Sequence, residues 1–484
     1  MEEVHVQLDI YNGFYESNSL PVSAQRLVNA YVHTPETEGA WSSQVIFPSP
    51  GLVQRVTTGA LNNQNRGAHV MAGVPYFVNG QYLYSVDEFN VATNLGTIPS
   101  IDKRVSMSDN GTQLLILIPS GNGYIFDRNL NTLVQITAAG FTSSGNPQYV
   151  VYVDSYFVCS TDSKKFIISA VNDGMSWNAL DFGSAEEDPD IIVAPWVFKG
   201  RLYMAGSETF EPFTNIGGGS FPFQSIQGGL LNVGLDAPYS LVDGRNHFYF
   251  IGGGENEKAA IWRTSGQAPE RVSTAAIETA LQNLTQAQID TVYAVSYAEE
   301  GSYFVGFHLP DTAFYFNEMN NKWHERTSVV DGVTTGWRVA SMVEAFGRNY
   351  AGDTEDGRIG EVLFDTYSSY DDDYVQRLLI TAPFNNEINT FFLPSLQLSM
   401  EVGEGTIANP SPQVRMSLSR DGGKSYGYER NRDVGAVGEY GRRVQWRRNG
   451  RFDQTAVLKF EFASPTKFVV VRLDAKIRAG VARF

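Results

Sequence analysis

The residues with the clearest chemical pattern lie in one short segment near the C-terminal end of the chain. The segment SRDGGKSY fits the form S-x-D-x-G-x-[ST]-aromatic at five positions: Ser419, Asp421, Gly423, Ser425 and Tyr426. In this pattern, the Asp box, the aspartate and hydroxyl side chains hydrogen-bond to the backbone of a β-hairpin turn, and the aromatic ring fills the space beneath it. A degenerate second copy, AVNDGMSW, ends at Trp177. We therefore predict a structural role for this motif and no catalytic one.

Asp boxes also occur in sialidase propellers, so hydrolysis of glycans is the enzymatic alternative. A sialidase needs an arginine cluster that holds the substrate carboxylate, a tyrosine nucleophile paired with an acid, and an acid/base aspartate. Arginines are sparse before Ser411, and the arginine-rich part lies at the C-terminal end. The 53 acidic residues offer many carboxylate pairs, but spacing singles out none of them. We predict that the protein is not an enzyme, and keep a sialidase-like or glycan-binding propeller as the alternative.

No pattern in the sequence predicts a metal, a cofactor or a nucleophile. The six histidines follow neither HExxH nor H-x-H spacing, and the chain has no P-loop, GxSxG or Rossmann-type glycine motif. The single cysteine, Cys159, lies in the apolar run YFVCS, where we expect a buried small side chain. His324 in KWHER is the most suggestive histidine because Glu325 and Arg326 adjoin it. We interpret these three residues as a structural salt-bridge cluster.

The elements that position these residues are predicted to be β-strands almost throughout. Pairs of apolar strands joined by Gly, Asn or Asp turns recur from about residue 51 onward. One residue late in each unit marks the repeat: Tyr84, Ile125, Ile167, Phe210, Trp262, Tyr315 and Val362. A spacing of about 40 to 50 residues is typical of β-propeller blades, so we expect about seven units over residues 51–366. A sandwich or barrel series would produce a similar succession of short strands.

Three segments fall outside this repeat. Residues 1–50 contain short apolar runs broken by Asn, Gly, Ser and Pro, and are predicted to form an N-terminal arm. A helical insertion is expected near residues 273–284, with Ser273 as its N-cap. Residues 367–484 contain new alternating strands and are predicted to form a separate basic domain like a β-sandwich. The predicted fold class is therefore all-β.

Charge is unevenly distributed between these parts. The formal net charge is −17; residues 411–484 carry 16 Lys/Arg against 7 Asp/Glu, which leaves 20 against 46 in the residues before them. A surface this acidic repels phosphates, so tight non-specific DNA binding is not expected. The basic part is expected to be either a solvated or interdomain face or a contact surface for an acidic neighbour, including another copy. No apolar run approaches about 18 residues and no secretory signal is visible, so no membrane span is predicted.

Several segments in a fixed order resemble one protein family. GRLYMAGSETFEPFTNIGGGSFPFQ begins at Gly200 and is followed by GLDAPYSL, IWRTSGQAPERVSTAAIETAL and NKWHERTS. TEDGRIG, SLSRDGGKSYG and VGAVGEYGRRVQWRRNGR come after them, and VNAYVHTPE and FPSPGL lie near the N-terminus. Together, over nearly the whole chain, these segments resemble the packaged-DNA stabilisation proteins of short-tailed bacteriophages, also called tail hub or nozzle proteins.

The resemblance implies a structural protein of the phage tail, made in the host cytoplasm and carried in the virion. Copies are expected to form a homo-oligomer, typically a six-membered ring, beneath the head-to-tail adaptor protein. The ring would extend the portal channel, retain packaged double-stranded DNA and conduct it during ejection without sequence-specific binding. A tail needle or plug would close the ring, and tail spike or fibre proteins are further expected partners.

Five arginines are the candidates for contacts with neighbouring subunits or the adaptor: Arg442, Arg443, Arg447, Arg448 and Arg451. A ring closes only through head-to-tail contacts between two different surfaces, and the acidic bulk of the chain supplies a complementary partner for a basic one. Arginines exposed on a strand surface without any partner are the simpler interpretation of the same residues.

Overall fold

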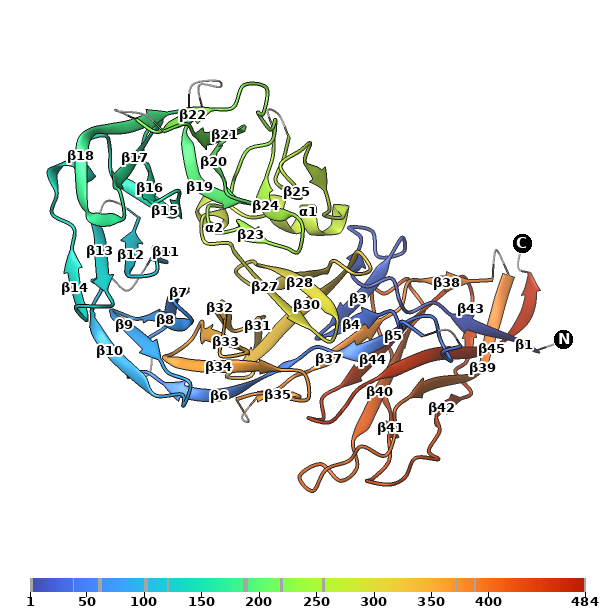
Figure 1. The fold of residues 1–484 in the computed structure, drawn as a ribbon. Helices are drawn as coiled ribbons and strands as arrows, with labels where there is room; N and C mark the ends of the chain where they lie inside the picture. Colours follow the sequence, from blue (N-terminus) through green and yellow to red (C-terminus); the bar gives the residue numbers. More distant parts are fainter. Residues whose placement is uncertain are drawn as a thin grey trace.

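The computed structural model describes residues 3–37, 39–59, 63–99, 103–119, 122–185, 190–217, 221–254, 257–370, 373–386 and 389–482. Within these ranges the chain is almost entirely β, and none of the helices has the length and apolar character needed to cross a membrane. Figure 1 shows a ring of small sheets on one side and a sandwich of longer strands on the other, with both termini at the sandwich end. The predicted all-β propeller with a C-terminal sandwich is confirmed.

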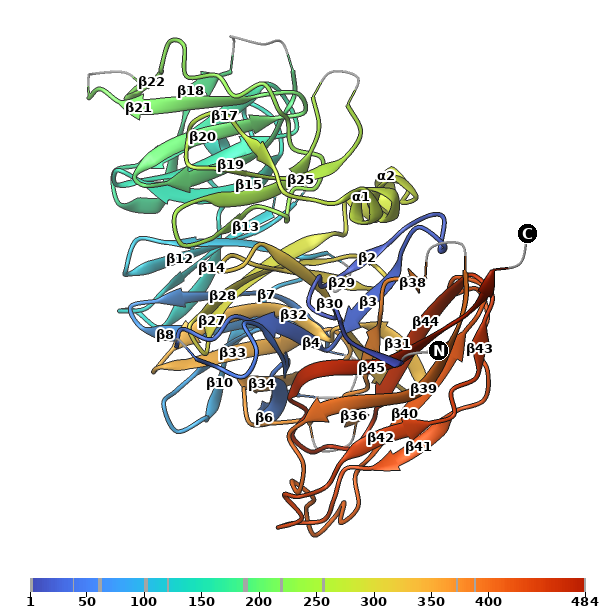
Figure 2. The same ribbon diagram turned by 90° about the vertical axis from the view of Figure 1, so that its right-hand side faces the viewer.

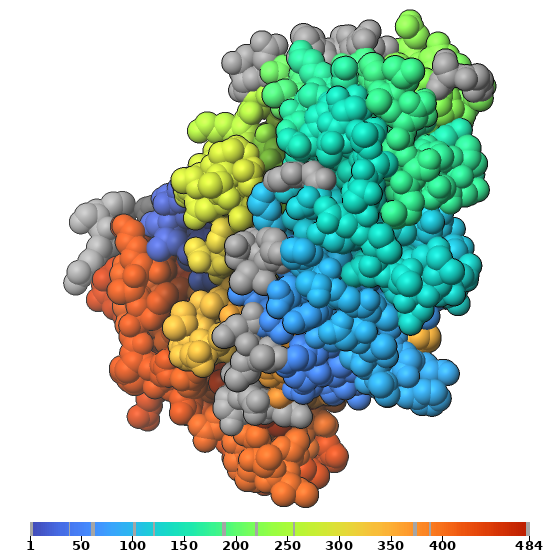
Figure 3. Space-filling model, turned by 90° about the vertical axis from the view of Figure 1, so that its left-hand side faces the viewer, coloured from blue at the N-terminus to red at the C-terminus, as the bar shows by residue number. Residues whose placement is uncertain are grey.

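Six blades make up most of the ring, and each is an antiparallel meander of four consecutive strands. Blade one contains β7 (Asn65–Met71), β8 (Val74–Asn79), β9 (Tyr82–Val86) and β10 (Ala92–Thr97). Blade two contains β11 (Ser106–Asp109), β12 (Gln113–Ile118), β13 (Asn122–Asp127) and β14 (Thr132–Gln135). Blade three contains β15 (Pro147–Val153), β16 (Tyr156–Thr161), β17 (Lys165–Ala170) and β18 (Asp173–Ser184). A 3-10 turn, η1 (Ala139–Phe141), lies between the second and third. Figure 3 shows these blades following one another across the surface, from blue through teal to green.

Blades four to six continue the same pattern. Blade four contains β19 (Ile192–Phe198), β20 (Arg201–Gly206), β21 (Phe210–Asn215) and β22 (Phe223–Ser225). Blade five contains β23 (Val242–Asp243), β24 (Phe248–Gly252), β25 (Ala260–Thr264) and β26 (Glu270–Arg271). Blade six contains β27 (Tyr293–Glu299), β28 (Ser302–His308), β29 (Ala313–Asn317) and β30 (Lys322–Val330), and β31 (Val333–Gly336) pairs with β30 beyond it. Tight turns within the blades place Asn131 and Asn321 at φ near +55°, a conformation that asparagine tolerates better than most residues. The Asn-rich turns of the sequence therefore mark real chain reversals.

The ring is completed by a sheet of different construction, which we call the closing sheet. It joins β32 (Val339–Ala345), β33 (Arg348–Asp353) and β34 (Arg358–Leu363) to β6 (Gly51–Thr57), and adds β35 (Ser368–Ser369) and β36 (Asp373–Tyr374) beyond it. The expectation of about seven repeat units is thus corrected to six blades of consecutive strands. The seventh sequence marker, Val362, lies in β34, but the fourth strand of its sheet comes from before the first blade.

The predicted helical insertion lies between the fifth and sixth blades as α1 (Ala275–Gln282) and α2 (Gln286–Ile289). The N-cap position of α1 is Thr274, one residue later than predicted. Ser273 has another role: its hydroxyl accepts a hydrogen bond from the Ile261 backbone and donates one to Glu278. Ile277 of α1 is fully buried in the core beneath the fifth blade.

The sandwich consists of two sheets that share one apolar core around Trp446 and Phe460. Its strands are β37 (Arg377–Ile380), β38 (Phe384–Asn385), β39 (Asn389–Met400), β40 (Gln413–Ser419), β41 (Arg430–Asp433), β42 (Val444–Arg447), β43 (Arg451–Phe452), β44 (Thr455–Phe462) and β45 (Val470–Ala482). One sheet has β39 between β42 and β45, and the other has the order β37, β44, β40, β41. Inward side chains alternate with outward ones, as the strand period requires.

The N-terminal segment is distributed over both parts of the molecule. It contains β1 (Glu3–Leu8), β2 (Tyr15–Glu16), β3 (Ala24–Val28), β4 (Ala30–His33) and β5 (Val45–Pro48). Strand β3 pairs with β30 of the sixth blade on one side and with β37 of the sandwich on the other, while β1 and β5 pair with β45. One 12-stranded sheet therefore runs from the propeller into the sandwich through β3, and Figure 2 shows this blue segment between the two.

Candidate functional site

The five arginines predicted as contact residues lie along one edge of the sandwich. Arg442 and Arg443 precede β42, Arg447 ends it, Arg448 follows it, and Arg451 begins β43. All five residues are exposed. Both strands pair with β39 from the same side, so the fold brings the five arginines together; we call this surface the arginine edge.

Two of these arginines form ion pairs within the sandwich. Arg442 Nη2 lies 2.5 Å from Asp433 Oδ2, and its Nη1 lies 3.3 Å from Glu439 Oε2. Arg451 Nη2 lies 2.8 Å from Asp453 Oδ1. All of these side chains are at least partly exposed, so each pair contributes little to stability. The pairs do neutralise much of the charge of Arg442 and Arg451.

The other three arginines keep their charge. Arg447 Nε donates to the amide oxygen of Gln445 at 3.3 Å, which leaves its charge uncompensated. Arg443 and Arg448 have no side-chain partner within the ranges that the structure describes. Arg443 and Arg448 are therefore the two cations of the arginine edge that no described side chain engages.

Two further arginines, which the sequence analysis did not single out, cap this edge. Arg432 Nε donates to the backbone oxygen of Gln445 at 2.6 Å, and Arg430 Nη1 donates to that of Arg447 at 3.3 Å. These carbonyls point outward from β42, where another strand would otherwise bind. The spacing of the two arginines in ERNRD was the available signal, because residues i and i+2 of a strand lie on one face. The arginine edge is thus cationic and closed to strand addition.

The Asp-box residues form the turn between β40 and β41. Asp421 Oδ1 accepts from the Ser419 hydroxyl at 2.6 Å and from the Ser425 backbone at 2.9 Å, and the Gly423 backbone donates to Ser419 Oγ at 2.8 Å. These hydrogen bonds from Ser419 and Ser425 hold the pKa of the Asp421 carboxyl well below its usual range. Tyr426 packs beneath the turn against the small cluster that includes Ala24. The motif organises the turn and fastens it to the N-terminal segment.

The degenerate second copy lies at the start of β18. Asp173 Oδ1 accepts from the Met175 backbone at 3.0 Å, and Trp177 Nε1 donates to the Gly174 oxygen at 2.7 Å. Trp177 is buried and stacks edge-on against Phe141. Here too the aspartate orders the turn and the aromatic ring fills the core of the blade.

The three residues of KWHER face different environments on β30, because neighbouring residues of a strand alternate between its faces. His324 is 2% exposed, and burial lowers the pKa of its imidazole well below the usual value. Glu325 forms a bidentate ion pair with Arg26 of β3. Arg326 instead lies 3.7 Å from the ring of Trp337. The interpretation of these three residues as one salt-bridge cluster is therefore wrong: Glu325 does form a structural salt bridge, but its partner is Arg26 of the N-terminal segment.

Within the described residues, no group of three His, Cys, Asp or Glu side chains is arranged to hold a metal ion. Cys159 is completely buried, which raises the pKa of its thiol. This agrees with its expected role as a small core residue. The Cys159 thiol is not expected to act as a nucleophile, because a reactive thiol needs exposure and a lowered pKa.

The centre of the ring contains a cavity of about 360 Å³ between the inner strands of the first five blades. Tyr149, Trp196 and Asp243 line it, and burial raises the pKa of the Asp243 carboxyl to about 6. A sialidase would present an arginine cluster in such a cavity; its described lining contains no arginine. The cavity therefore lacks the group that would hold a substrate carboxylate.

The axis of the ring is blocked next to this cavity. The guanidinium carbon of Arg104, from before the second blade, lies 4.0 Å from the ring of Tyr293 on the sixth blade. Arg104 Nη2 donates to the Ala340 oxygen of the closing sheet at 2.8 Å, and the Tyr239 hydroxyl donates to the Arg104 oxygen at 2.9 Å. Side chains from opposite sides of the ring thus meet across the axis. Among the described residues, these contacts close the axis of the propeller at this level.

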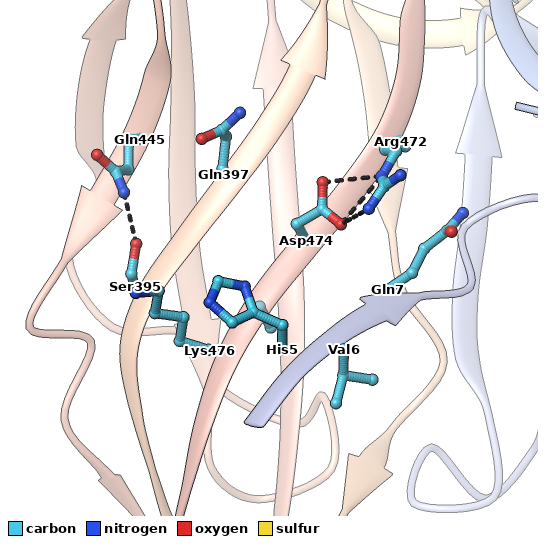
Figure 4. Close-up of a pocket in the computed structure, with 10 residues that line it drawn as sticks. His5, Val6, Gln7, Ser395, Gln397, Gln445, Arg472, Asp474 and Lys476 are labelled. Carbon is cyan, nitrogen blue, oxygen red and sulfur yellow. Dashed lines mark hydrogen bonds and ion pairs between the residues drawn. The ribbon is translucent and has the colours of Figure 1, made fainter. Parts of the chain in front are cut away.

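A shallow polar groove of about 290 Å³ lies on the outer face of the sandwich sheet that contains β1, β45, β39 and β42. Figure 4 shows its side chains on four adjacent strands, with His5 on β1, Lys476 on β45, Gln397 on β39 and Gln445 on β42. Gln445 Nε2 donates to Ser395 Oγ at 2.7 Å. Three glutamine amides and the charged side chains of Arg472, Asp474 and Lys476 supply most of its polar groups, and its described lining includes no Trp, Tyr or Phe ring.

Comparisons with known proteins give one family. A family model described as bacteriophage P22 Gp10, beta-propeller, matches residues 6–367, and a second, described as bacteriophage P22 Gp10, beta-sandwich, matches residues 376–478. The two matches meet close to the junction between the closing sheet and the sandwich. A search of curated protein sequences gives no match.

Solved structures resemble the chain only distantly. The WD40 β-propeller domain of Doa1 is 12% identical with a TM-score of 0.39, and the alignment covers 65% of this chain and 97% of that one. The extracellular domain of the hybrid two-component system BT4673 from B. thetaiotaomicron is 8% identical with a TM-score of 0.42, covering 64% and 39%. The computationally designed Ika8 protein is 12% identical with a TM-score of 0.38, covering 70% and 99%.

Proposed function

Since the chain belongs to the bacteriophage P22 Gp10 family, a family of structural tail-hub proteins of the virion, we propose that its copies form a closed ring in the phage tail. The ring continues the channel below the portal and its adaptor, retains the packaged double-stranded DNA and conducts it during ejection. Six is the expected number of copies. The tail needle or plug and the spike or fibre proteins are the further proposed partners, and the role is not enzymatic.

One observation carries this proposal: the blocked axis of the propeller. Arg104, Tyr239 and Tyr293 meet across that axis, whereas the major groove of B-DNA alone is about 12 Å wide. No duplex passes through a single copy by this route. A conduit built from this chain must therefore lie between copies, and copies arranged around a common channel form a ring.

The distribution of charge supports the same arrangement. The residues before Ser411 carry 20 Lys/Arg against 46 Asp/Glu, so the propeller repels a duplex rather than holding it. Each lysine or arginine bound to a phosphate would slow DNA movement in a salt-dependent way. The exposed cations Arg443 and Arg448 lie on the sandwich, where they face an acidic neighbouring copy or the adaptor in the proposed ring.

The test is electron microscopy of the purified protein, alone and mixed with the portal–adaptor complex of the same phage. We expect closed rings of one subunit number on the adaptor. Open filaments, or single copies in every mixture, would contradict the proposal. Particles assembled without the protein should also lose packaged DNA on dilution, and full retention of DNA would refute the proposed role in retention.

A further inference from the structure

Strand β1 is an edge strand with an unusual degree of exposure. It pairs with β45 along its whole length, from Glu3 opposite Arg478 to Leu8 opposite Leu473. Five of its six residues are exposed, and no described residue pairs with its other side. Figure 1 shows β1 at the outer end of the sandwich, beside the N-terminus. Its free backbone groups are available for pairing.

The side chains of β1 alternate in character. Val4, Val6 and Leu8 lie on the core side, opposite Ile477, Ala475 and Leu473 of β45. Leu8 is buried in the sandwich core, but Val4 is 55% and Val6 37% exposed. The intervening residues His5 and Gln7 line the polar groove on the other face, and Val6 also borders it. A strand added to the free edge of β1 would thus meet apolar side chains on one face and polar ones on the other.

The opposite edge of the same sheet, β42, is protected from pairing with another strand, whereas β1 is not. Native edge strands are blunted by charges, prolines, bulges or caps that prevent pairing with another chain. Arg430 and Arg432 cap the outward carbonyls of β42. No described side chain caps the carbonyls of β1, which also contains no proline or bulge. The edge of β1 is therefore open to a partner strand along its half-apolar length.

We propose that the free edge of β1 binds β1 of a second copy, antiparallel, around a two-fold axis at His5. In this register Val4 lies opposite Val6 of the other copy, and Glu3 lies opposite Gln7. A shift of one residue would place apolar side chains opposite polar ones, because it moves a strand's side chains to the other face. An axis at Val6 keeps the same alternation, but it places Val4 opposite Leu8, whose side chain is already buried in the sandwich core. Of the registers that keep the alternation, the axis at His5 is the one that places the exposed Val4 opposite the exposed Val6 of the other copy.

This pairing goes beyond the proposed ring and is independent of it. A two-fold contact uses the same surface on both copies, whereas ring closure uses two different surfaces. The paired strands would also make the two polar grooves continuous across His5. The paired dimer is the form of the free protein before it docks on the adaptor. Ring formation on the adaptor can therefore succeed or fail independently of this pairing.

The register can be tested by disulfide formation, because the natural Cys159 is buried and unreactive. Directly opposed residues of antiparallel strands have Cα atoms about 4.5–5.5 Å apart, within the range of a disulfide. We expect His5→Cys to form a covalent dimer under mild oxidation. Gln7→Cys should not, because the two copies of residue 7 would lie about 13 Å apart. The double variant Glu3→Cys/Gln7→Cys should again form dimers.

Three outcomes would overturn the proposal. The first is no covalent dimer from His5→Cys. The second is equal crosslinking of Gln7→Cys. The third is equal crosslinking of a control, Val333→Cys, which is exposed on β31 of the propeller. In sedimentation experiments on the reduced protein, Val4→Lys/Val6→Lys should weaken the dimer by at least about 10-fold. Both valines are exposed, so a folded variant that dimerises as strongly as the natural chain also counts against it.

Discussion

Arg26 of β3 and Glu325 of β30 form a bidentate ion pair at the point where the propeller meets the sandwich. Arg26 Nε lies 2.9 Å from Glu325 Oε2, and its Nη2 lies 2.8 Å from Oε1. Glu325 is 4% exposed, and burial raises the pKa of its carboxyl in spite of the arginine. The strand that joins the two parts of the molecule is thus fastened by a buried charge pair.

The first prediction concerns the loss of this cation. Arg26→Met leaves the Glu325 carboxylate buried without a partner, which costs about 3–5 kcal/mol for a fully buried pair. Because the Arg26 side chain is 32% exposed, we expect a smaller loss, about 2–3 kcal/mol, seen as a lower calorimetric melting temperature. The control is Arg415→Met, which removes the exposed pair with Glu429 and should cost less than about 1 kcal/mol. Equal losses in the two variants would show that the junction pair has no special role.

The same variant should respond to pH in a defined direction. The pKa of Glu325 is raised, so the folded state binds this proton more readily than the unfolded state, and the contribution of the group to stability rises as pH falls toward the unfolded value near 4.5. Loss of Arg26 raises the pKa further. The stability difference between Arg26→Met and the natural protein should therefore shrink between pH 7 and pH 4.5. A difference that stays constant over this range would contradict the assignment of Glu325 as the stranded charge.

The repeat and the architecture could be predicted because they depend on local patterns. The marker residues Tyr84 and Trp262 both lie in the third strand of a blade, since turn residues and apolar alternation repeat along the chain. The fourth strand of the closing sheet could not be predicted in this way. Strand β6 lies about 300 residues from β34 in sequence, and only the closure of the ring brings them together.

The candidate sites could likewise be predicted only where their geometry depends on residues close together in sequence. The Asp box determines its own geometry within eight residues, so its turn could be derived from the spacing of Ser419 and Asp421. The partner of Glu325 could not, because Arg26 is distant in sequence and reaches it only through the pairing of β3 with β30. Likewise, nothing in the sequence separates the paired Arg442 from the unpaired Arg443. That distinction depends on the loop that carries Glu439.

The second prediction concerns two buried histidines. Burial, with nearby Arg104 and Arg326, lowers the pKa of His308 to about 3, and burial lowers that of His324 well below its ordinary value. The unfolded chain takes up these protons near pH 6.5 and the folded chain does not. The contribution of the two neutral histidines to the free energy of unfolding is therefore fully present above about pH 6.5. It is lost as pH falls toward 3, by up to about 1.4 kcal/mol per pH unit for each histidine.

His324→Phe tests this pH dependence. The ring of His324 lies among Tyr31, Phe304 and Tyr315, and its Nε2 has no hydrogen-bond partner in the described structure. Phenylalanine should fit this apolar site and remove one titrating group. We expect a shallower fall of the melting temperature between pH 6 and pH 4, with little change between pH 7 and pH 8. Parallel curves for the two proteins would show that His324 is already protonated in the fold.

The third prediction concerns the Asp-box turn. Asp421 accepts hydrogen bonds from Ser419 and Ser425, which lower the pKa of its carboxyl. The contribution of the ionised carboxylate to stability is therefore present above about pH 4 and is lost as pH falls further. Asp421→Asn should loosen the turn between β40 and β41 by about 1 kcal/mol, because the site is exposed. Hydrogen exchange of the Gly423 amide should accelerate. Lys424→Gln in the same turn should leave that exchange unchanged, and equal acceleration in both would refute the role of the carboxylate.

The fourth prediction concerns the arginine edge. Arg443→Glu/Arg448→Glu reverses the two exposed cations that have no described partner, so the fold should keep its melting temperature while rings on the adaptor are lost. The control Lys199→Glu/Arg201→Glu makes the same change of charge on the propeller and should leave rings intact. Because exposed charges are screened, ring formation by the natural protein should weaken between about 0.1 M and 1 M salt. If the reversed variant forms rings as readily as the control, the arginine edge is a solvated face and ring closure uses another surface.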